Sequence, residues 1–236
     1  MALAIFDLDN TLLAGDSDYL WGVFLAEMGA VDRDHYEREN ERFYREYREG
    51  RLDIFEFLAF SLRPLATHPL SQLLAWREQF LVERIDPIIT AAARELVERH
   101  RDAGDTLMII TATNAFVTAP IAARFGIPHL IATDPEQCDG RYTGQVAGIP
   151  SFREGKVQRL DAWLSEHGGD LAGAWFYSDS HNDLPLLERV THPVAVDPDG
   201  QLAATAAARG WPVISLRGGA DALSDSAGNA TPPPAA

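Results

Sequence analysis

The chain has 236 residues, of which 46% are hydrophobic and 23% are charged, and its formal net charge is −15 at pH 7. This length suits one large domain, or one domain with a second inserted into it. The acidic balance argues against a nucleic-acid partner, because affinity for a phosphate backbone depends on clustered Lys and Arg.

The apolar runs of the sequence are too short for a membrane segment, because spanning a bilayer takes roughly 20 apolar residues. Asp7 and Asp9 interrupt the apolar stretch at the N-terminus, which has no basic leader, so no signal peptide is expected. The single cysteine, Cys138, excludes an intrachain disulfide and a thiolate metal cluster. We therefore expect a cytoplasmic protein that does not associate with membranes.

Short apolar runs alternate with helical patterns, and this alternation predicts an α/β fold with a doubly wound, Rossmann-like parallel sheet. Ligands bind such sheets at the carboxyl ends of the strands. Asp7, Thr111 and Asp179 each come just after an apolar run, so we expect all three to reach one crevice. The predicted strands are 3–6, 106–110, 129–132, 174–177, 193–196 and 212–216, and the helical patterns between them are 88–100, 115–125 and 156–167.

One stretch, 16–86, departs from this alternation of strands and helices, because it is rich in aromatic and charged residues and has no strand-like run. Aromatic residues between positions 36 and 47 recur at helical spacing, which is typical of a helix that packs one side in a core. We interpret this stretch as an all-helical insertion, or cap, in an α/β core made of 1–15 and 87–216.

Two further segments lie outside the alternation of strands and helices. Residues 139–148 resemble a turn followed by a short strand, which predicts a hairpin beside the crevice. The composition of 217–236 changes to Gly, Ala, Ser, Asp and Pro, so we expect a disordered tail without a catalytic role.

Two carboxylates, Asp7 and Asp9, stand at the exit of the first predicted strand. Like charges at this spacing raise a pKa or require a counter-ion. A divalent cation such as Mg2+ meets that requirement, because it binds one or two carboxylates together with waters and phosphate oxygens. The N-terminal stretch is therefore a candidate site of phosphoryl transfer.

Three more polar clusters follow strands or open a helix. Taken singly, a Thr after a strand is typical of a helix N-cap, and a Lys at a helix start usually points to solvent. Together with the first pair and in this order, the clusters resemble the haloacid dehalogenase-like superfamily of aspartyl phosphotransferases, over residues 3 to about 197. The three clusters are Thr111-Ala112-Thr113-Asn114, Lys156 after Glu154-Gly155, and Ser178-Asp179-Ser180-His181-Asn182-Asp183.

The resemblance implies catalytic and phosphate-binding roles for five residues. Asp7 would be the nucleophile that forms an aspartyl-phosphate. Asp9 would protonate the leaving alcohol and then activate water, because a carboxylic acid regains its proton in each cycle. Thr111 and Lys156 would hold the transferring phosphoryl group, and Asn182 would contact it as well.

The resemblance also implies a Mg2+ site. The side chains of Asp7 and Asp179 and the backbone carbonyl of Asp9 would be ligands, and Asp183 would bind directly or through water. The second cluster departs from the relatives nearest the phosphoserine phosphatases, which often have Ser followed by glycines. Thr111 keeps the hydroxyl, so we still expect it to bind phosphate.

The insertion directly after the first cluster resembles the phosphoserine-phosphatase-like subgroup. Its small helical caps close over the crevice and recognise the leaving group. In the phosphoserine enzymes an acidic residue shortly after the first motif binds the ammonium group of the substrate, and Asp16 stands at the matching place. Asp16 could equally cap a helix that starts near Asp18, and both interpretations stay open at this point.

The sequence from Gly15 to Trp21, with the Thr111 cluster, resembles a bacterial branch often assigned as histidinol-phosphate phosphatase. We therefore predict a Mg2+-dependent phosphomonoesterase for a small phosphorylated metabolite, an amino-alcohol phosphate such as histidinol phosphate or phosphoserine. Phosphoserine would also require an Arg in the cap, for which Arg51, Arg63 and Arg84 are the candidates.

Two alternative functions stay open. The chain could be a catalytically slow relative that acts as a regulatory or interaction protein, or a phosphotransferase to an acceptor other than water. The sequence gives no indication of the oligomeric state.

Overall fold

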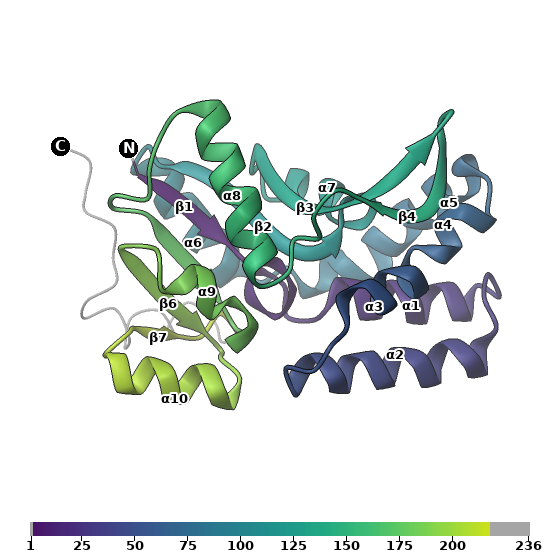
Figure 1. The fold of residues 1–236 in the computed structure, drawn as a ribbon, viewed down its shortest axis with the longest axis horizontal. Coiled ribbons are helices and arrows are strands. Elements are labelled where there is room, and N and C mark those ends of the chain that lie inside the picture. The colour runs from purple at the N-terminus through teal and green to yellow at the C-terminus, as the bar shows by residue number, and fades with distance from the viewer. Residues whose placement is uncertain (1, 218–236) are drawn as a thin grey trace.

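The computed structural model describes residues 2–217, in which seven strands form one sheet in the order β4-β3-β2-β1-β5-β6-β7 (Figure 1). All neighbouring strands are parallel except β4, which is antiparallel to β3. The predicted α/β fold with a parallel sheet is thereby confirmed. The strands are β1 (Leu3–Phe6), β2 (Thr106–Asn114), β3 (His129–Cys138), β4 (Arg141–Ala147), β5 (Trp175–Ser178), β6 (His192–Val196) and β7 (Val213–Ile214).

The central strand β1 is buried on both faces, as expected of an apolar run between two parallel neighbours. Phe6 packs on one face of the sheet, in a cluster with buried residues of α6 (Ala91–Asp102) and α7 (Ala115–Arg124). Ile5 packs on the opposite face, against α8 (Glu154–His167), α9 (Leu184–Leu187) and α10 (Gly200–Arg209). The sheet is therefore covered by helices on both faces, and its carboxyl edge is left for ligands.

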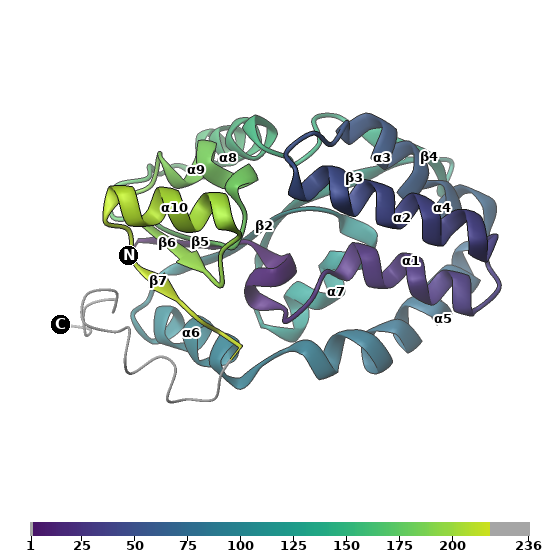
Figure 2. The ribbon, with the colours of Figure 1, turned by 90° about the horizontal axis from the view of Figure 1, so that it is seen from below.

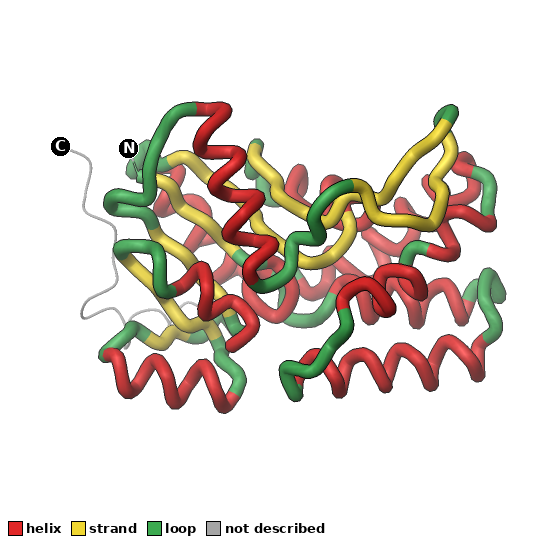
Figure 3. The backbone as a smooth tube through the Cα atoms, viewed as in Figure 1, coloured by secondary structure: helices red, strands yellow, loops and turns green. Residues whose placement is uncertain are grey.

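All secondary-structure elements between β1 and β2 are helices or helical turns (Figure 3). Its aromatic residues join the core: Trp21 packs 5.1 Å from Phe80 and 6.0 Å from Phe116 of α7, between ring centroids. The predicted inserted helical cap is therefore present and packs on the α7 side of the core (Figure 2). Its elements are α1 (Ser17–Glu27), α2 (Arg33–Arg48), α3 (Ile54–Ser61), α4 (Arg63–Thr67), α5 (Leu70–Phe80) and the turns η2 (Leu81–Ile85) and η3 (Asp86–Ile88).

The chain leaves the core and returns to it at one place. Leu13 pairs with Ile89 in an antiparallel bridge, and the Ala14 N–H donates to the Ile88 carbonyl at 2.8 Å. These contacts hold the base of the cap directly beside the turn η1 (Leu8–Leu12), which contains Asp9.

Some predicted boundaries were wrong. The helix predicted at 88–100 begins at Ala91, because the Thr90 side chain accepts a hydrogen bond from the Ala93 N–H and caps it. The strand predicted at 106–110 continues to Asn114, so Thr111 lies within β2, next to an irregularity in its pairing with β3. None of the described helices is long and apolar enough to cross a membrane.

The hairpin predicted at 139–148 is present, and its strands β3 and β4 extend towards α4 of the cap (Figure 1). Gly144 is needed at the contact, because its φ is +82° and an added Cβ would lie 3.2 Å from the Cβ of Ala66. The hairpin therefore supports the cap from the core side.

The tail predicted at 217–236 lies outside the described residues, apart from Arg217. The Arg217 guanidinium donates to the backbone carbonyls of Leu13 at 2.6 Å and Asn10 at 2.5 Å. Arg217 thus packs on the turn that follows β1 and belongs structurally to the core.

Candidate active site

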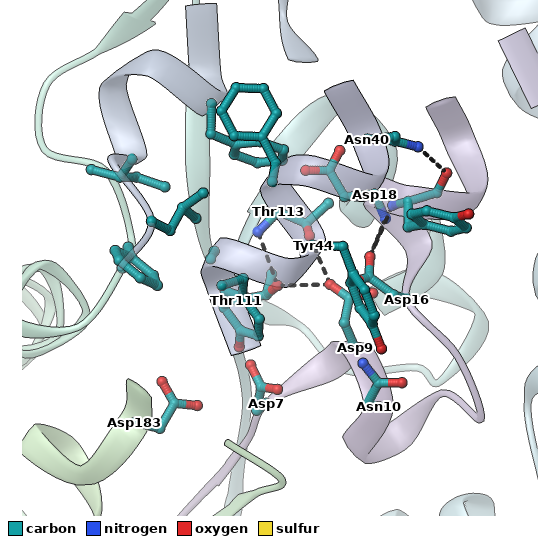
Figure 4. A pocket seen from close by; sticks show the side chains of 18 of the residues that line it. Asp7, Asp9, Asn10, Asp16, Asp18, Asn40, Tyr44, Thr111, Thr113 and Asp183 are labelled. Atoms are coloured by element: carbon teal, nitrogen blue, oxygen red, sulfur yellow. Dashed lines mark hydrogen bonds between the residues drawn. The ribbon is translucent and has the colours of Figure 1, made fainter. Parts of the chain in front are cut away.

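A cavity lies where the carboxyl ends of β1 and β2 face the cap helices α1, α2 and α3 (Figure 4). Its polar lining includes six of the predicted site residues, and its other wall is largely aromatic. Asp179 and Asn182 are absent from its lining among the described residues. The predicted residues that line it are Asp7, Asp9, Asp16, Thr111, Lys156 and Asp183.

Asp7 is the first residue after β1, and its backbone N–H donates to the Tyr177 carbonyl of β5 at 2.9 Å. Its side chain is almost fully buried and accepts a hydrogen bond from Lys156 Nζ at 2.8 Å. Burial raises the pKa of Asp7 to about 7, although the charge of Lys156 lowers it. Asp7 is therefore a carboxylate whose ionised form depends on a neighbouring cation.

Lys156 is only 4% exposed and bridges two carboxylates, with Nζ 2.8 Å from both Asp7 and Asp183. Burial lowers the pKa of Lys156, but the charges of Asp183 and Asp7 more than offset this and raise it. The start of α8, just before Lys156, lies very close to the preceding loop. An added Cβ on Gly155 would lie 2.1 Å from the Pro150 carbonyl oxygen, so only glycine fits there.

Asp9 is fixed by three donors. Its Oδ1 accepts from the Ser17 N–H of α1 at 2.6 Å, and its Oδ2 accepts from Thr113 Oγ1 at 2.7 Å and Thr111 Oγ1 at 3.4 Å. Asn10, at φ 54°, bends the chain here. The Thr111 hydroxyl therefore points towards Asp9, and Thr113 is a site residue that the sequence reasoning did not single out, although it lies in the quoted cluster.

Asp179 follows β5 and shares one hydroxyl with Asp7. Thr11 Oγ1 lies 3.2 Å from Asp179 Oδ1 and 3.3 Å from Asp7 Oδ2. Its single proton can serve only one of these carboxylates at a time. Burial, followed by the charge of Asp7, raises the pKa of Asp179. The two carboxylates thus converge on one hydroxyl, and of the two only Asp7 is paired with Lys156 among the described residues.

The residues around Asp7 fit a hard divalent cation. Mg2+ needs only one or two carboxylates with carbonyl, water and phosphate oxygens, and the Asp7–Asp179 pair provides two. No group of three or more His, Cys, Asp or Glu side chains that could hold a metal ion is present among the described residues. Asp183 accepts from Lys156 and, at 2.7 Å, from Ser178 Oγ, so a direct bond to the ion would compete with these two donors.

Asn182 joins the core to the cap in this structure. Its Nδ2 donates to the Tyr47 carbonyl at the end of α2 at 3.2 Å, and its Oδ1 accepts from Arg153 Nε at 2.9 Å. Arg153 Nη2 in turn donates to the Gly50 carbonyl at 2.5 Å. Asn182, which we expected to contact phosphate, therefore links the end of α2 to the core segments that contain Asn182 and Arg153.

Asp16 caps helix α1 and also lines the cavity. Its Oδ1 accepts from the N–H groups of Asp18 at 3.0 Å and Tyr19 at 2.9 Å. Burial, followed by the charge of Asp9, raises the pKa of Asp16 to about 7. The two interpretations of Asp16 are therefore compatible in this geometry, because the capping bonds use one of its two oxygens.

Comparisons with known proteins identify the family of the chain. Residues 4–188 match the family of haloacid dehalogenase-like hydrolases. The chain is 47% identical to the histidinol-phosphatase of Neisseria meningitidis serogroup C (strain 8013), over 91% of this chain and 99% of that protein. It is 32% identical to a phosphoserine phosphatase of Mycobacterium tuberculosis, over 92% of this chain and 71% of that protein.

A solved structure gives the same fold at high similarity. The crystal structure of a protein with unknown function from Bordetella pertussis Tohama I superimposes with a TM-score of 0.86. The two sequences are 51% identical, and the match covers 91% of this chain and 98% of that one.

Proposed function

Because the chain belongs to the haloacid dehalogenase-like hydrolases, we propose that it is a Mg2+-dependent phosphomonoesterase that acts through an aspartyl-phosphate on a small amino-alcohol phosphate. The relatives that support this assignment are phosphatases, one for histidinol phosphate and one for phosphoserine. The observation that carries the proposal is the contact of buried Asp7 with Lys156, in one cavity with Asp9.

In the first step a carboxylate oxygen of Asp7 attacks the phosphorus atom of the substrate. A bond from Asp7 to phosphorus forms as the bond from phosphorus to the alcohol oxygen breaks, and Asp9 donates its proton to that oxygen. Lys156 favours the ionised form of Asp7 and lowers its repulsion of the anionic phosphoryl group.

In the second step Asp9 accepts a proton from water as the water oxygen attacks phosphorus. The bond from phosphorus to Asp7 breaks, inorganic phosphate leaves, and both carboxylates return to their starting states. The Ser17 N–H and the Thr113 hydroxyl hold Asp9 in place for both proton transfers.

We propose that Asp7, Asp179 and the Asp9 carbonyl hold Mg2+, with Asp183 binding directly or through water. When bound, the ion neutralises negative charge on the phosphoryl oxygens. The convergence of Asp7 and Asp179 on the Thr11 hydroxyl supports this ligand set.

Histidinol phosphate is the substrate that we favour, and phosphoserine is the alternative. The 47% identity to a histidinol-phosphatase supports this choice, as do the aromatic cavity wall and the carboxylate of Asp16, which suits a primary amine.

The test is a phosphate-release assay with Mg2+ across phosphorylated metabolites and an aryl phosphate, with wild type and Asp7→Asn. We expect phosphate release by wild type and none by the folded variant. No turnover of any ester by wild type would favour a regulatory protein. Transfer to a non-water acceptor without free phosphate would favour a phosphotransferase.

A further inference from the structure

The half of the cavity away from Lys156 is lined by acidic side chains. Asp9, Asp16 and Asp18 line it, and in Figure 4 Asp9, Asp16 and Asp18 follow one another away from Asp7. Lys156 is the one Lys or Arg side chain among the described residues that line the cavity, and it is already bound to Asp7 and Asp183. The leaving group of a substrate would therefore meet carboxylates without a counter-cation.

The wall of this half is aromatic. Phe43 of α2 and Phe57 of α3 pack edge to face at 5.3 Å, and Tyr44 lies 5.7 Å from Tyr19, between ring centroids. All four rings line the cavity. Aromatic faces favour a flat or cationic partner, so the cavity suits a ring that carries positive charge.

The three arginines that could have bound a substrate carboxylate are placed elsewhere. Arg51 pairs with Glu49, and Arg84 pairs with Glu27. Arg63 lines a separate groove on the cap. A carboxylate on the leaving group would lose its hydration beside Asp16 and Asp18 without a compensating cation, and such a site rejects it.

Asp18 is the unexplained carboxylate of this site. Its carboxylate oxygens accept no hydrogen bond from the described residues, and burial followed by the charges of Asp16 and Asp9 raises its pKa. Asp16 is already used as the cap of α1. Asp18 therefore adds to the cavity a carboxylate that is not used for capping, and the aromatic wall lines the same cavity.

We propose that Asp18 is a specificity-determining residue that binds a second cationic or N–H group of the leaving group, and that the cavity rejects esters with a carboxylate. The preferred substrate class is an amino-alcohol phosphate with a nitrogen-containing ring and no carboxylate. This inference rests on the proposed phosphatase function.

The experiment measures kcat/KM for four esters: histidinol phosphate, the phosphate ester of phenylalaninol, phosphoserine and p-nitrophenyl phosphate. Phenylalaninol keeps the amine and a ring but lacks ring nitrogen. In wild type we expect histidinol phosphate to exceed phosphoserine by about 100-fold or more. Asp18→Asn should lower the ratio of histidinol phosphate to phenylalaninol phosphate about tenfold, mainly through KM.

Two further variants serve as controls. Asp18→Glu keeps the charge and should retain most of that ratio. Asp34 occupies the first turn of α2 as Asp18 does in α1, but it is exposed at the surface, so Asp34→Asn should leave the ratio at its wild-type value.

The outcomes separate the inference from the proposed function. If wild type hydrolyses phosphoserine within tenfold of histidinol phosphate, or if Asp18→Asn leaves the substrate ratio unchanged, the inference is wrong and the phosphatase stands. If wild type hydrolyses none of the four esters, the proposed function fails and the inference fails with it.

Discussion

Lys156 and Asp7 are 149 positions apart in the sequence, yet Lys156 Nζ lies 2.8 Å from Asp7 Oδ1 in a region almost closed to water. The same ammonium group binds Asp183. Burying a single charge here would be very costly, and the three groups are tolerated because each has an opposite charge within hydrogen-bond distance.

We expect Lys156→Met to destabilise the protein and to abolish turnover. Removing one partner of a buried ion pair costs about 3–5 kcal/mol, because the remaining charges are left uncompensated. The loss of stability should be smaller at pH 5 than at pH 8. The pKa of Asp7 is already about 7 beside the lysine, so at pH 5 Asp7 takes up a proton and no longer needs a counter-charge. Urea unfolding at the two pH values measures the difference, and equal losses would contradict the charge-compensation role.

Chelation should inactivate the enzyme reversibly. Asp7 and Asp179 share the Thr11 hydroxyl and have raised pKa values, so we expect Mg2+ to bind there and EDTA to stop phosphate release. Mg2+ should also raise the Tm of wild type, and Asp179→Asn should remove that shift. Asp161→Asn, which alters a surface pair with Arg189, is the control. Full activity after exhaustive chelation would remove Mg2+ from the mechanism.

Asp16→Asn should stabilise the protein more at pH 8 than at pH 5. The folded pKa of Asp16 is about 7 and its ordinary value is 3.8, so the folded state holds the proton more tightly. The stability from this group is therefore fully present below pH 3.8 and is lost as the pH rises through 7. Asn keeps the cap of α1 without the charge.

Thermal unfolding of Asp16→Asn measures this effect, with an expected Tm gain at pH 8 of roughly 2–4 °C for about 1 kcal/mol. Asp32 caps α2 at the surface, so Asp32→Asn is a matched control that should show no such pH dependence. A Tm gain of the same size at both pH values would contradict a pKa of Asp16 that burial and the charge of Asp9 raise.

Thr113→Val should lower kcat about tenfold with little change in KM. The Thr113 hydroxyl holds Asp9 Oδ2 at 2.7 Å, and a general acid that is less well positioned transfers its proton less efficiently. Thr118 is a buried threonine of α7 whose hydroxyl donates to the Asn114 carbonyl, so Thr118→Val controls for the loss of a hydroxyl. An equal fall in kcat for both variants would indicate a general packing effect.

The sequence by itself determined the sheet, the helical insertion and the edge where the site lies. Short apolar runs such as 3–6 that alternate with helical patterns are typical of buried strands, and parallel strands bring Asp7 and Asp179 to the same edge of the sheet. The spacing of aromatic residues in the insertion likewise required helices that pack one face inward.

Only the tertiary structure decided which of these side chains touch. Lys156 pairs with Asp183 as well as Asp7, Thr113 holds Asp9, and Asn182 is drawn to the end of α2. These contacts join residues far apart in the chain, and they depend on the angle at which helices and loops pack, which local patterns do not encode. The same holds for Asp18: its sequence position marks a helix start, and only the packing of α2 and α3 places it in the cavity.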